Sequence, residues 1–165
     1  MKILFIQTGG TIDKAYPMND DNHGYNFQIG QPAFERILKR VNPSCEYETR
    51  SILKKDSTDI TDDDRLLIHE LCANDKADKI IITHGTDTMI QTARVLSSIH
   101  GKTIVITGAM QPELFKDSDA DFNLGTAIGA MSYVKPDIYI AMCGNIMKWD
   151  EVMFDASINK FRLNT

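Results

Sequence analysis

Short aliphatic and β-branched runs alternate with amphipathic stretches along this chain. The runs predict five strands, at residues 3–7, 47–53, 79–83, 103–107 and 138–143. The central runs, at 80–82 and 104–106, are continuously apolar and lack the alternation of a half-exposed strand. Continuous apolar strands of this length are typical of a parallel sheet that is covered on both faces.

The stretches between these runs have helical periodicity. Their apolar positions each form one stripe at the spacing of a helix: Phe34, Ile37, Leu38 and Val41; Leu67, Ile68, Leu71 and Cys72; Met89, Ala93 and Leu96; and Leu124, Ala127, Ile128 and Met131. The second helix should begin at Thr61, whose hydroxyl can cap free backbone amides, and the third near Asp87. Strand–helix alternation predicts an α/β fold, a doubly wound and mainly parallel sheet with helices on both faces.

Polar turns follow four of the predicted strands. Their sequences are rich in Gly, Ser, Thr and Asp and occupy residues 8–11, 56–59, 84–88 and 108–112. In doubly wound sheets, ligands bind outside the carboxyl ends of the strands. The four turns are therefore the predicted functional edge of the sheet.

The connection between Thr11 and the first predicted helix, near Gln31, is long for a strand–helix connection, which usually takes about two to six residues. Its polar, turn-forming centre at 19–24 fits either a binding lid over residues 12–30 or a surface excursion without function.

Size and composition narrow the possible classes of protein. The 165 residues predict one domain over 1–165, and 42% hydrophobic with 25% charged residues is ordinary for a globular chain. A net charge of −5 argues against nucleic acid or an anionic membrane as a partner. The sequence suggests no membrane span and no secretory signal. Three scattered cysteines predict neither disulfides nor a zinc site, which favours a cytoplasmic location.

Two of the turns carry groups that suit a small ligand. Gly9 and Gly10 let the backbone turn sharply and present amides, and the Thr11 hydroxyl follows directly. This arrangement suits a phosphate or a carboxylate, or it is a plain glycine turn. Thr86 and Asp87 either bind a ligand ammonium group or cap the next helix.

Other motifs in the sequence lack residues that metal binding or nucleotide binding would require. Asp117, Asp119 and Asp121 have the spacing of a calcium loop, but Phe122 replaces the required glycine, so a solvated or helix-capping turn is expected. The four histidines have no metal-ligand spacing, and the dinucleotide fingerprint is absent. The sequence predicts no metal and no cofactor. A flavodoxin-like phosphate loop at 8–11 is disfavoured because the next helix begins too late to direct its dipole at a phosphate.

Three of the turns, taken in order, resemble one known family. Residues 8–12 (TGGTI), 84–89 (HGTDTM) and 108–112 (GAMQP), with 120–124 (ADFNL), are similar to the N-terminal domain of the bacterial-type L-asparaginases. The resemblance covers nearly the whole chain. It implies the fold of that domain, a flavodoxin-like arrangement of three layers. It also implies the hydrolysis of asparagine, or of a related small amide, to the acid and ammonia without a cofactor.

The resemblance assigns catalytic roles to four residues. Thr11 would be the nucleophile, assisted by Tyr25 on the long connection. Thr86 and Asp87 would form a second catalytic group, and Asp87 would also hold the substrate α-ammonium. A threonine hydroxyl is a weak nucleophile, so it needs a positioned base.

The resemblance also assigns substrate contacts. Asp56, Ser57 and the Gly10 amide would hold the α-carboxylate, and the Ala109 carbonyl would lie near the leaving amide. Backbone amides around Gly85 and Thr86 could stabilise the oxyanion.

The chain departs from the family pattern in two respects. Family members usually carry a lysine at the position where this chain has Phe154, and they are about twice as long, with a second domain. Loss of a general base commonly lowers the rate by roughly 10²- to 10⁴-fold. The sequence therefore predicts a weak asparaginase-like amidohydrolase or, as the alternative, an amino-acid-binding protein of the same family with impaired catalysis. A homodimer is expected, because symmetric dimers are the commonest oligomers and can complete an open site.

Overall fold

The computed structural model describes residues 1–16 and 26–164. Six strands form the main sheet in the order β4-β1-β5-β6-β7-β8, and its first five strands are parallel. They are β1 (Lys2–Gly9), β4 (Glu46–Lys55), β5 (Lys79–Thr83), β6 (Thr103–Thr107) and β7 (Ile138–Met142). The last, β8 (Asn145–Lys148), runs antiparallel to β7. The parallel order is that of flavodoxin-like sheets, which confirms the predicted α/β class.

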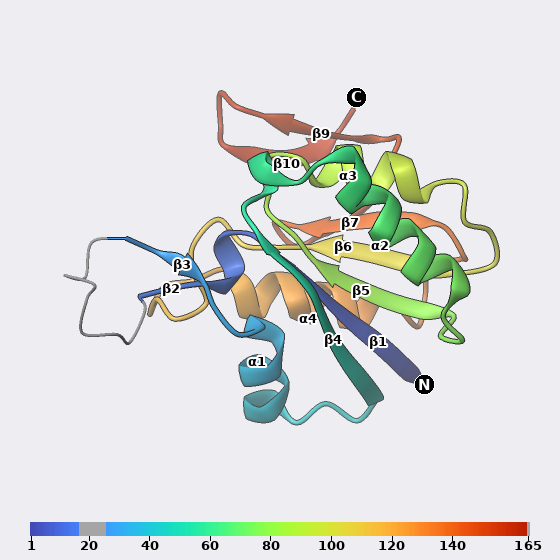
Figure 1. Ribbon diagram of the computed structural model, residues 1–165, viewed down its shortest axis with the longest axis horizontal. Helices are drawn as coiled ribbons and strands as arrows, with labels where there is room; N and C mark the ends of the chain where they lie inside the picture. The colour runs from blue at the N-terminus through green and yellow to red at the C-terminus, as the bar shows by residue number, and fades with distance from the viewer. Residues whose placement is uncertain (17–25, 165) are drawn as a thin grey trace.

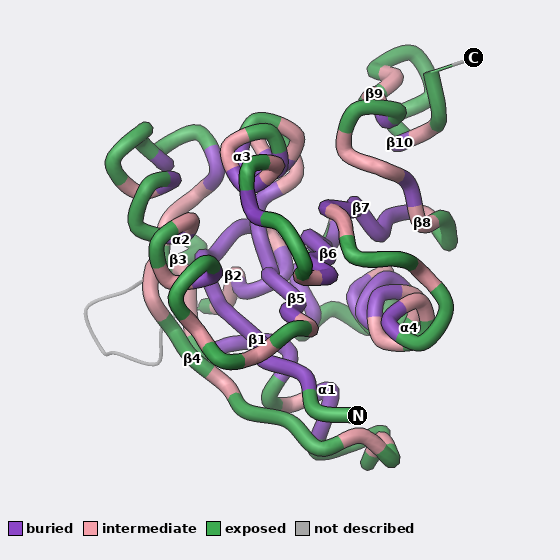
Figure 2. The backbone as a smooth tube through the Cα atoms, turned by 90° about the vertical axis from the view of Figure 1, so that its right-hand side faces the viewer, coloured by how far each residue is buried: buried purple, intermediate pink, exposed green. Residues whose placement is uncertain are grey.

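Two pairs of helices enclose this sheet, as Figure 1 shows. α2 (Asp62–Asn74) and α3 (Met89–Leu96) pack on one face, through Ile68, Cys72 and Leu96 among others. α1 (Ala33–Val41) and α4 (Ala120–Ala130) cover the other face. The buried strands lie between the two layers in Figure 2. The three-layer arrangement arises because the central strands are apolar on both faces.

The strand predictions hold best at the centre of the sheet. β5 and β6 have the predicted bounds and are buried almost throughout. β4 is longer than predicted and mostly exposed, because it is an edge strand with one neighbour. The short antiparallel pairs, β2 (Lys14–Ala15) with β3 (Gln28–Ile29) and β9 (Val152–Asp155) with β10 (Lys160–Leu163), were not predicted. Segments of two to four residues are too short to show a period.

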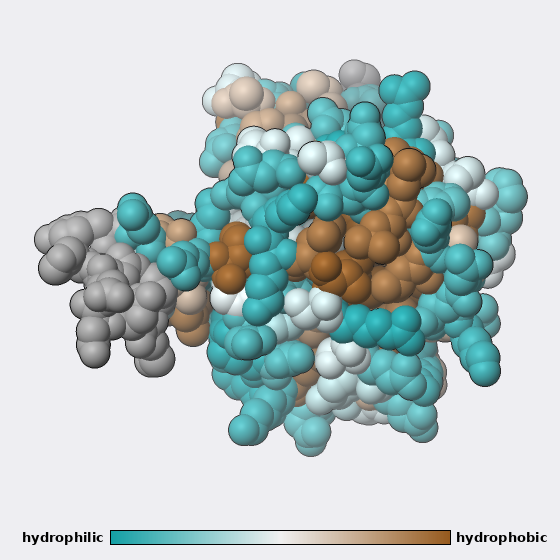
Figure 3. Space-filling model, viewed as in Figure 1, coloured by the Kyte–Doolittle hydropathy of each residue, from teal (hydrophilic) through white to brown (hydrophobic). Residues whose placement is uncertain are grey.

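The helix predictions are confirmed in position, with differences in burial. Thr61 caps α2 in a capping box with Asp64, as its sequence predicts. Leu67, however, is exposed beside Leu66, whereas Ile68 and Cys72 are buried. Figure 3 shows an apolar surface on the face of the molecule that carries α2. α3 begins at Met89, two residues after Asp87.

The described parts of the long connection after β1 contain short regular elements. Thr11 opens a 3₁₀ turn, η1 (Thr11–Asp13), and β2 then pairs with β3 as an antiparallel hairpin. Tyr25 lies outside the described residues, so its assignment stays a prediction. No helix among the described parts of the chain is long and apolar enough to cross a membrane.

Candidate functional site

The order of the strands reverses between β1 and β5. In doubly wound sheets, ligands bind outside the carboxyl ends of the strands at such a reversal. The strands end in register, with Gln7 opposite Thr83 and Thr83 opposite Thr107. The turns that follow β1, β5 and β6 therefore emerge side by side. These are three of the four polar turns that the sequence singles out.

Gly10 and Gly85 bring the first two of these turns into direct backbone contact. A Cβ atom on Gly10 would lie 2.3 Å from the Gly85 nitrogen and 2.4 Å from its Cα. Gly10 also has φ +90° and ψ −179°, a conformation that is essentially restricted to glycine. The Gly10 amide donates to the Lys55 carbonyl at 3.0 Å, so the predicted contact of this amide with a substrate carboxylate competes with an existing bond.

Ser57 joins the same cluster from the turn after β4, which forms the short η2 helix (Ser57–Asp59). A Cβ atom on Gly85 would lie 2.6 Å from both the Cβ and the Oγ of Ser57. The buried Ser57 hydroxyl donates to Asp87 Oδ2 at 3.2 Å, and the Thr88 hydroxyl donates to the Ser57 carbonyl at 2.7 Å. Ser57 and Asp87, which are both assigned to substrate binding, are thus hydrogen-bonded although they lie 30 residues apart in the sequence.

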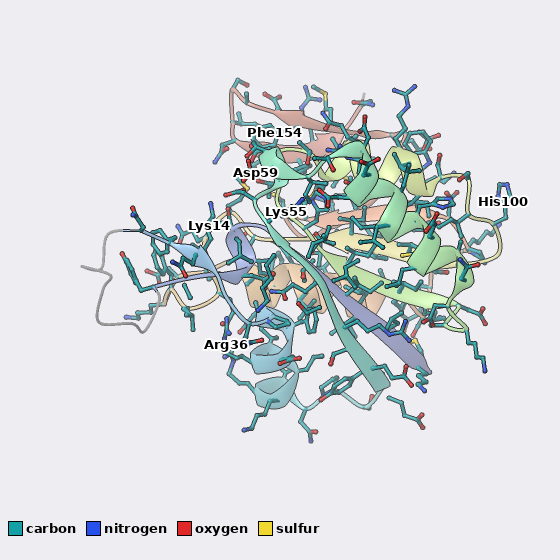
Figure 4. All side chains as sticks on the ribbon, in the orientation of Figure 1. Lys14, Arg36, Lys55, Asp59, His100 and Phe154 are labelled. Atoms are coloured by element: carbon teal, nitrogen blue, oxygen red, sulfur yellow. The ribbon has the colours of Figure 1, made fainter. Side chains whose placement is uncertain are left out.

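Asp56 lies at the start of this turn with both carboxylate oxygens engaged. Oδ1 accepts the Ser57 backbone N–H at 3.0 Å, and Oδ2 lies 2.6 Å from Lys14 Nζ. Lys14 follows η1 and begins β2, and its own backbone N–H donates to the Thr11 carbonyl. Figure 4 shows Lys14, Lys55 and Asp59 on the same side of the molecule. The sequence does not indicate Lys14 as part of the site, because nothing along the chain relates it to Asp56.

His84 fixes the turn that carries Thr86 and Asp87. Burial lowers the pKa of His84 to about 4, so the imidazole is neutral at physiological pH. Its Nδ1 lies 2.8 Å from the Gly85 carbonyl, which can only accept, so Nδ1 carries the proton. Nε2 then accepts from the Thr92 hydroxyl at 2.8 Å. His84 therefore acts as an internal support of the Gly85 turn.

The turn after β6 is held in place by side chains at the start of α4. The Asp119 carboxylate accepts from the Met110 and Gln111 backbone amides at 3.0 and 3.1 Å. Asn123 donates to the Gly108 carbonyl at 3.0 Å. A solvated or helix-capping turn is predicted here. Asp117 and Asp121 are exposed, as a solvated turn requires, whereas the Asp119 side chain makes no capping bond to α4 and bridges two segments instead. The side chain of Ala109 is buried in the core against α1 and α4.

The residues with the proposed chemistry are thus distributed over turns that touch. Thr11 and Thr86 are half-buried, one residue after Gly10 and one after Gly85 respectively, and Asp87 is exposed. Phe154 lies on β9 (Figure 4). Its ring packs on Phe161 at a centroid distance of 5.1 Å. A phenylalanine there offers no proton acceptor. Among the described residues, no group of three or more His, Cys, Asp or Glu side chains could hold a metal ion.

A cavity of about 680 Å³ lies at the opposite end of the sheet. Its lining includes Lys2 and Lys79, which begin β1 and β5, together with Arg50 and Asp75, which pair at 2.6 Å. Ligands of doubly wound sheets bind at the carboxyl ends of the strands. We therefore place the candidate site at the turns and not in this cavity.

Asp13 is a buried carboxyl two residues after Thr11. Its Oδ1 accepts the Ala33 N–H at 2.7 Å, at the first residue of α1. Burial raises the pKa of Asp13 to about 7, although the bond from Ala33 favours the charged form. Asp13 thus connects the 3₁₀ turn that carries Thr11 to the helix that follows the hairpin.

This buried carboxyl should make stability depend on pH. Because its folded pKa is raised from 3.8, Asp13 contributes stability that is full below about pH 4 and is lost as pH rises through about 7. We expect the free energy of unfolding of wild type to fall between pH 4.5 and pH 8, relative to Asp13→Asn, by on the order of 2–4 kcal/mol. Urea titrations at several pH values measure it. The free energy of unfolding of Asp150→Asn, a substitution at an exposed position, should change with pH as that of wild type does. If the free energy of unfolding of Asp13→Asn also runs parallel to wild type across this pH range, the pKa of Asp13 is not raised.

Comparison with known proteins agrees with this architecture. Residues 2–153 match the family model described as "Asparaginase, N-terminal". The chain belongs to the asparaginase N-terminal family. It is 36% identical over 153 residues to an L-asparaginase of Thermococcus kodakarensis, covering 89% of this chain and 45% of that protein. It is 30% identical over 133 residues to L-asparaginase 2 of Escherichia coli, covering 76% of this chain and 37% of the relative.

Solved asparaginases share the fold over nearly the whole chain. The thermostable L-asparaginase from Thermococcus kodakarensis superposes with a TM-score of 0.83 at 34% identity, covering 99% of this chain and 51% of that structure. L-asparaginase I from Vibrio cholerae gives a TM-score of 0.83 at 24% identity, again covering 99% and 51%. The chain therefore spans about half the length of these asparaginases.

Proposed function

We propose that this chain hydrolyses the side-chain amide of asparagine, or of a related small amide, to the acid and ammonia. The observation that carries the proposal is the contact of Gly10 with Gly85 and of Gly85 with Ser57, which gathers Thr11, Thr86, Asp87 and Ser57 at one edge of the sheet. Membership of the asparaginase family supports the reaction class.

In the proposed reaction, the Thr11 Oγ attacks the amide carbon of the substrate and its proton passes to the surrounding network. Collapse of the tetrahedral intermediate breaks the carbon–nitrogen bond, and the leaving nitrogen takes up a proton and departs as ammonia. Water then hydrolyses the threonine ester and regenerates the hydroxyl. Backbone amides near Gly85 are the proposed donors to the oxyanion. Tyr25 is proposed to assist Thr11, and the Ala109 carbonyl to face the leaving amide.

Recognition of the substrate is proposed to divide between two groups. Asp87 takes the α-ammonium, since its Oδ2 is held by Ser57 and a second oxygen is available in an exposed position. The Ser57 hydroxyl takes the α-carboxylate by exchanging its bond to Asp87 for one to the substrate, and Asp56 is the adjoining residue of the same turn. Ammonia release from millimolar asparagine and glutamine by purified protein tests the proposal directly. No release above that of a buffer blank would contradict it.

The second candidate function is amino-acid binding without turnover, and Phe154 favours it. The position lacks the lysine of the family, so the Thr86–Asp87 group has no partner base there. Calorimetry that detects aspartate binding, combined with no ammonia release, would select this function. Because Phe154 is partly exposed on β9, Phe154→Lys should fold normally and raise any residual rate about 10-fold or more. Phe161→Leu, which changes the ring partner of Phe154 and adds no base, serves as the control.

We further propose a homodimer located in the cytoplasm. The cysteines Cys45, Cys72 and Cys143 are free, which suits a reducing compartment. A relative from Haemophilus influenzae is described as a probable periplasmic L-asparaginase, so cell fractionation is the deciding measurement. Light scattering coupled to size exclusion gives the oligomeric state.

A further inference from the structure

Lys14 and Asp56 form an ion pair that connects the turn after β1 to the turn after β4. Lys14 Nζ lies 2.6 Å from Asp56 Oδ2, and each side chain retains about a third of its exposure, at 27% and 32%. The backbone of Lys14 is bonded to the Thr11 carbonyl, and Asp56 accepts the Ser57 N–H. One pair therefore joins the proposed nucleophile's turn to the proposed carboxylate-binding turn.

The charges around Ser57 explain why a cation is needed at this place. Three carboxylates, Asp56, Asp59 and Asp87, lie on or beside the turns that surround Ser57. The neighbouring Lys55 is already paired with Asp64 at 2.7 Å, on the side of α2. Of the two lysines, Lys14 is therefore the one that faces the carboxylate adjoining Ser57.

An unpaired Asp56 would oppose the binding of an α-carboxylate. The resemblance assigns Asp56 to this contact, yet two neighbouring negative charges repel each other at a partly buried site, so Asp56 can adjoin an α-carboxylate only if its own charge is neutralised. The pair itself contributes little to the stability of the fold, because water screens ion pairs that are this exposed. Its consequence should thus appear in ligand affinity more than in stability.

We propose that Lys14 is a specificity-determining positioning residue, which neutralises Asp56 so that the Ser57 turn accepts the α-carboxylate of an amino acid. This inference rests on the proposed function and deepens it. Asp87 remains as the charged partner of the ammonium group. The site then suits a zwitterionic amino acid and disfavours an amide that lacks the carboxylate.

Calorimetric titration with L-aspartate tests the proposal in five proteins. We expect wild type to bind, Lys14→Met to bind about 10-fold more weakly, and Lys14→Arg to restore most of the affinity. The decisive variant is the double substitution Lys14→Met with Asp56→Asn. It removes the negative charge and keeps an oxygen for the Ser57 N–H, so affinity should return towards that of wild type. Lys2→Met is the matched control, because it breaks the ion pair with Glu48 at the opposite end of β1.

The outcomes separate this inference from the function on which it rests. Equal affinity of wild type and Lys14→Met overturns the role of Lys14 and leaves the proposed function standing. Weak binding that persists in the double variant also overturns it, since Lys14 would then act through structure alone. Failure of wild type to bind aspartate, together with no ammonia release from asparagine, overturns the proposed function and this inference with it.

Discussion

Thr11→Ala should abolish ammonia release while the protein stays folded. If the Thr11 Oγ forms the covalent bond to substrate, its removal eliminates the step that the rest of the site supports. Loss of a nucleophile lowers turnover by roughly 10³- to 10⁶-fold in well-studied hydrolases. Thr11 is half-buried in a 3₁₀ turn, so a smaller side chain should change the melting temperature by only a few degrees. A coupled ammonia assay and thermal unfolding measure the two effects.

Two comparison variants make the Thr11 experiment specific. Thr11→Ser keeps a hydroxyl at the same place and should retain measurable activity. Thr126→Ala removes a hydroxyl that bonds the Phe122 carbonyl within α4, on the exposed surface, and should leave activity unchanged. Full activity in Thr11→Ala would assign the chemistry elsewhere. Aspartate binding that survives in Thr11→Ala without turnover would separate the nucleophile from the binding groups.

The sequence predicts the central sheet because the signal there is strong. Three consecutive isoleucines at 80–82, and the run at 104–106, have no polar face, and a parallel sheet covered by helices is the structure that buries such strands. The start of α2 is equally clear, since Thr61 and Asp64 form a capping box through local bonds. Local hydrogen bonds at helix ends and strong hydrophobic periodicity are thus the reason that most of the three-layer fold can be predicted from the sequence.

The sequence predicts where the site lies in the fold, but it does not predict most of the contacts that hold the site together. That the turns meet follows from strand direction, so Thr11 and Thr86 could be placed at one edge from the sequence. The contacts that fix them are between residues distant along the chain, such as Lys14 with Asp56 and Asp119 with the Met110 amide. No pattern of residue types relates these partners. The Gly10 amide is likewise engaged by a carbonyl of β4, which only the register of the sheet reveals.

Gly10→Ala should be among the most destabilising substitutions in the chain, and the reason is the same contact that assembles the site. The new Cβ would lie 2.3–2.7 Å from backbone atoms of His84 and Gly85, which cannot rotate away as a side chain can. The backbone of Gly10 also occupies a region that residues with a Cβ adopt only under strain. Strain and overpacking together should lower the free energy of unfolding by about 4–6 kcal/mol, a large part of what a domain of this size possesses.

Urea unfolding of Gly10→Ala beside Gly125→Ala isolates the cause. Gly125 lies within α4, and a Cβ there would meet no atom within 4 Å, so alanine should stabilise the helix by about 0.5–1 kcal/mol. The two substitutions add the same methyl group, and the opposite signs expected for them arise from backbone conformation and space alone. If Gly10→Ala unfolds at the wild-type urea concentration, the turns after β1 and β5 are not in contact. Thr11 and Thr86 would then lack the common edge on which the proposed chemistry depends.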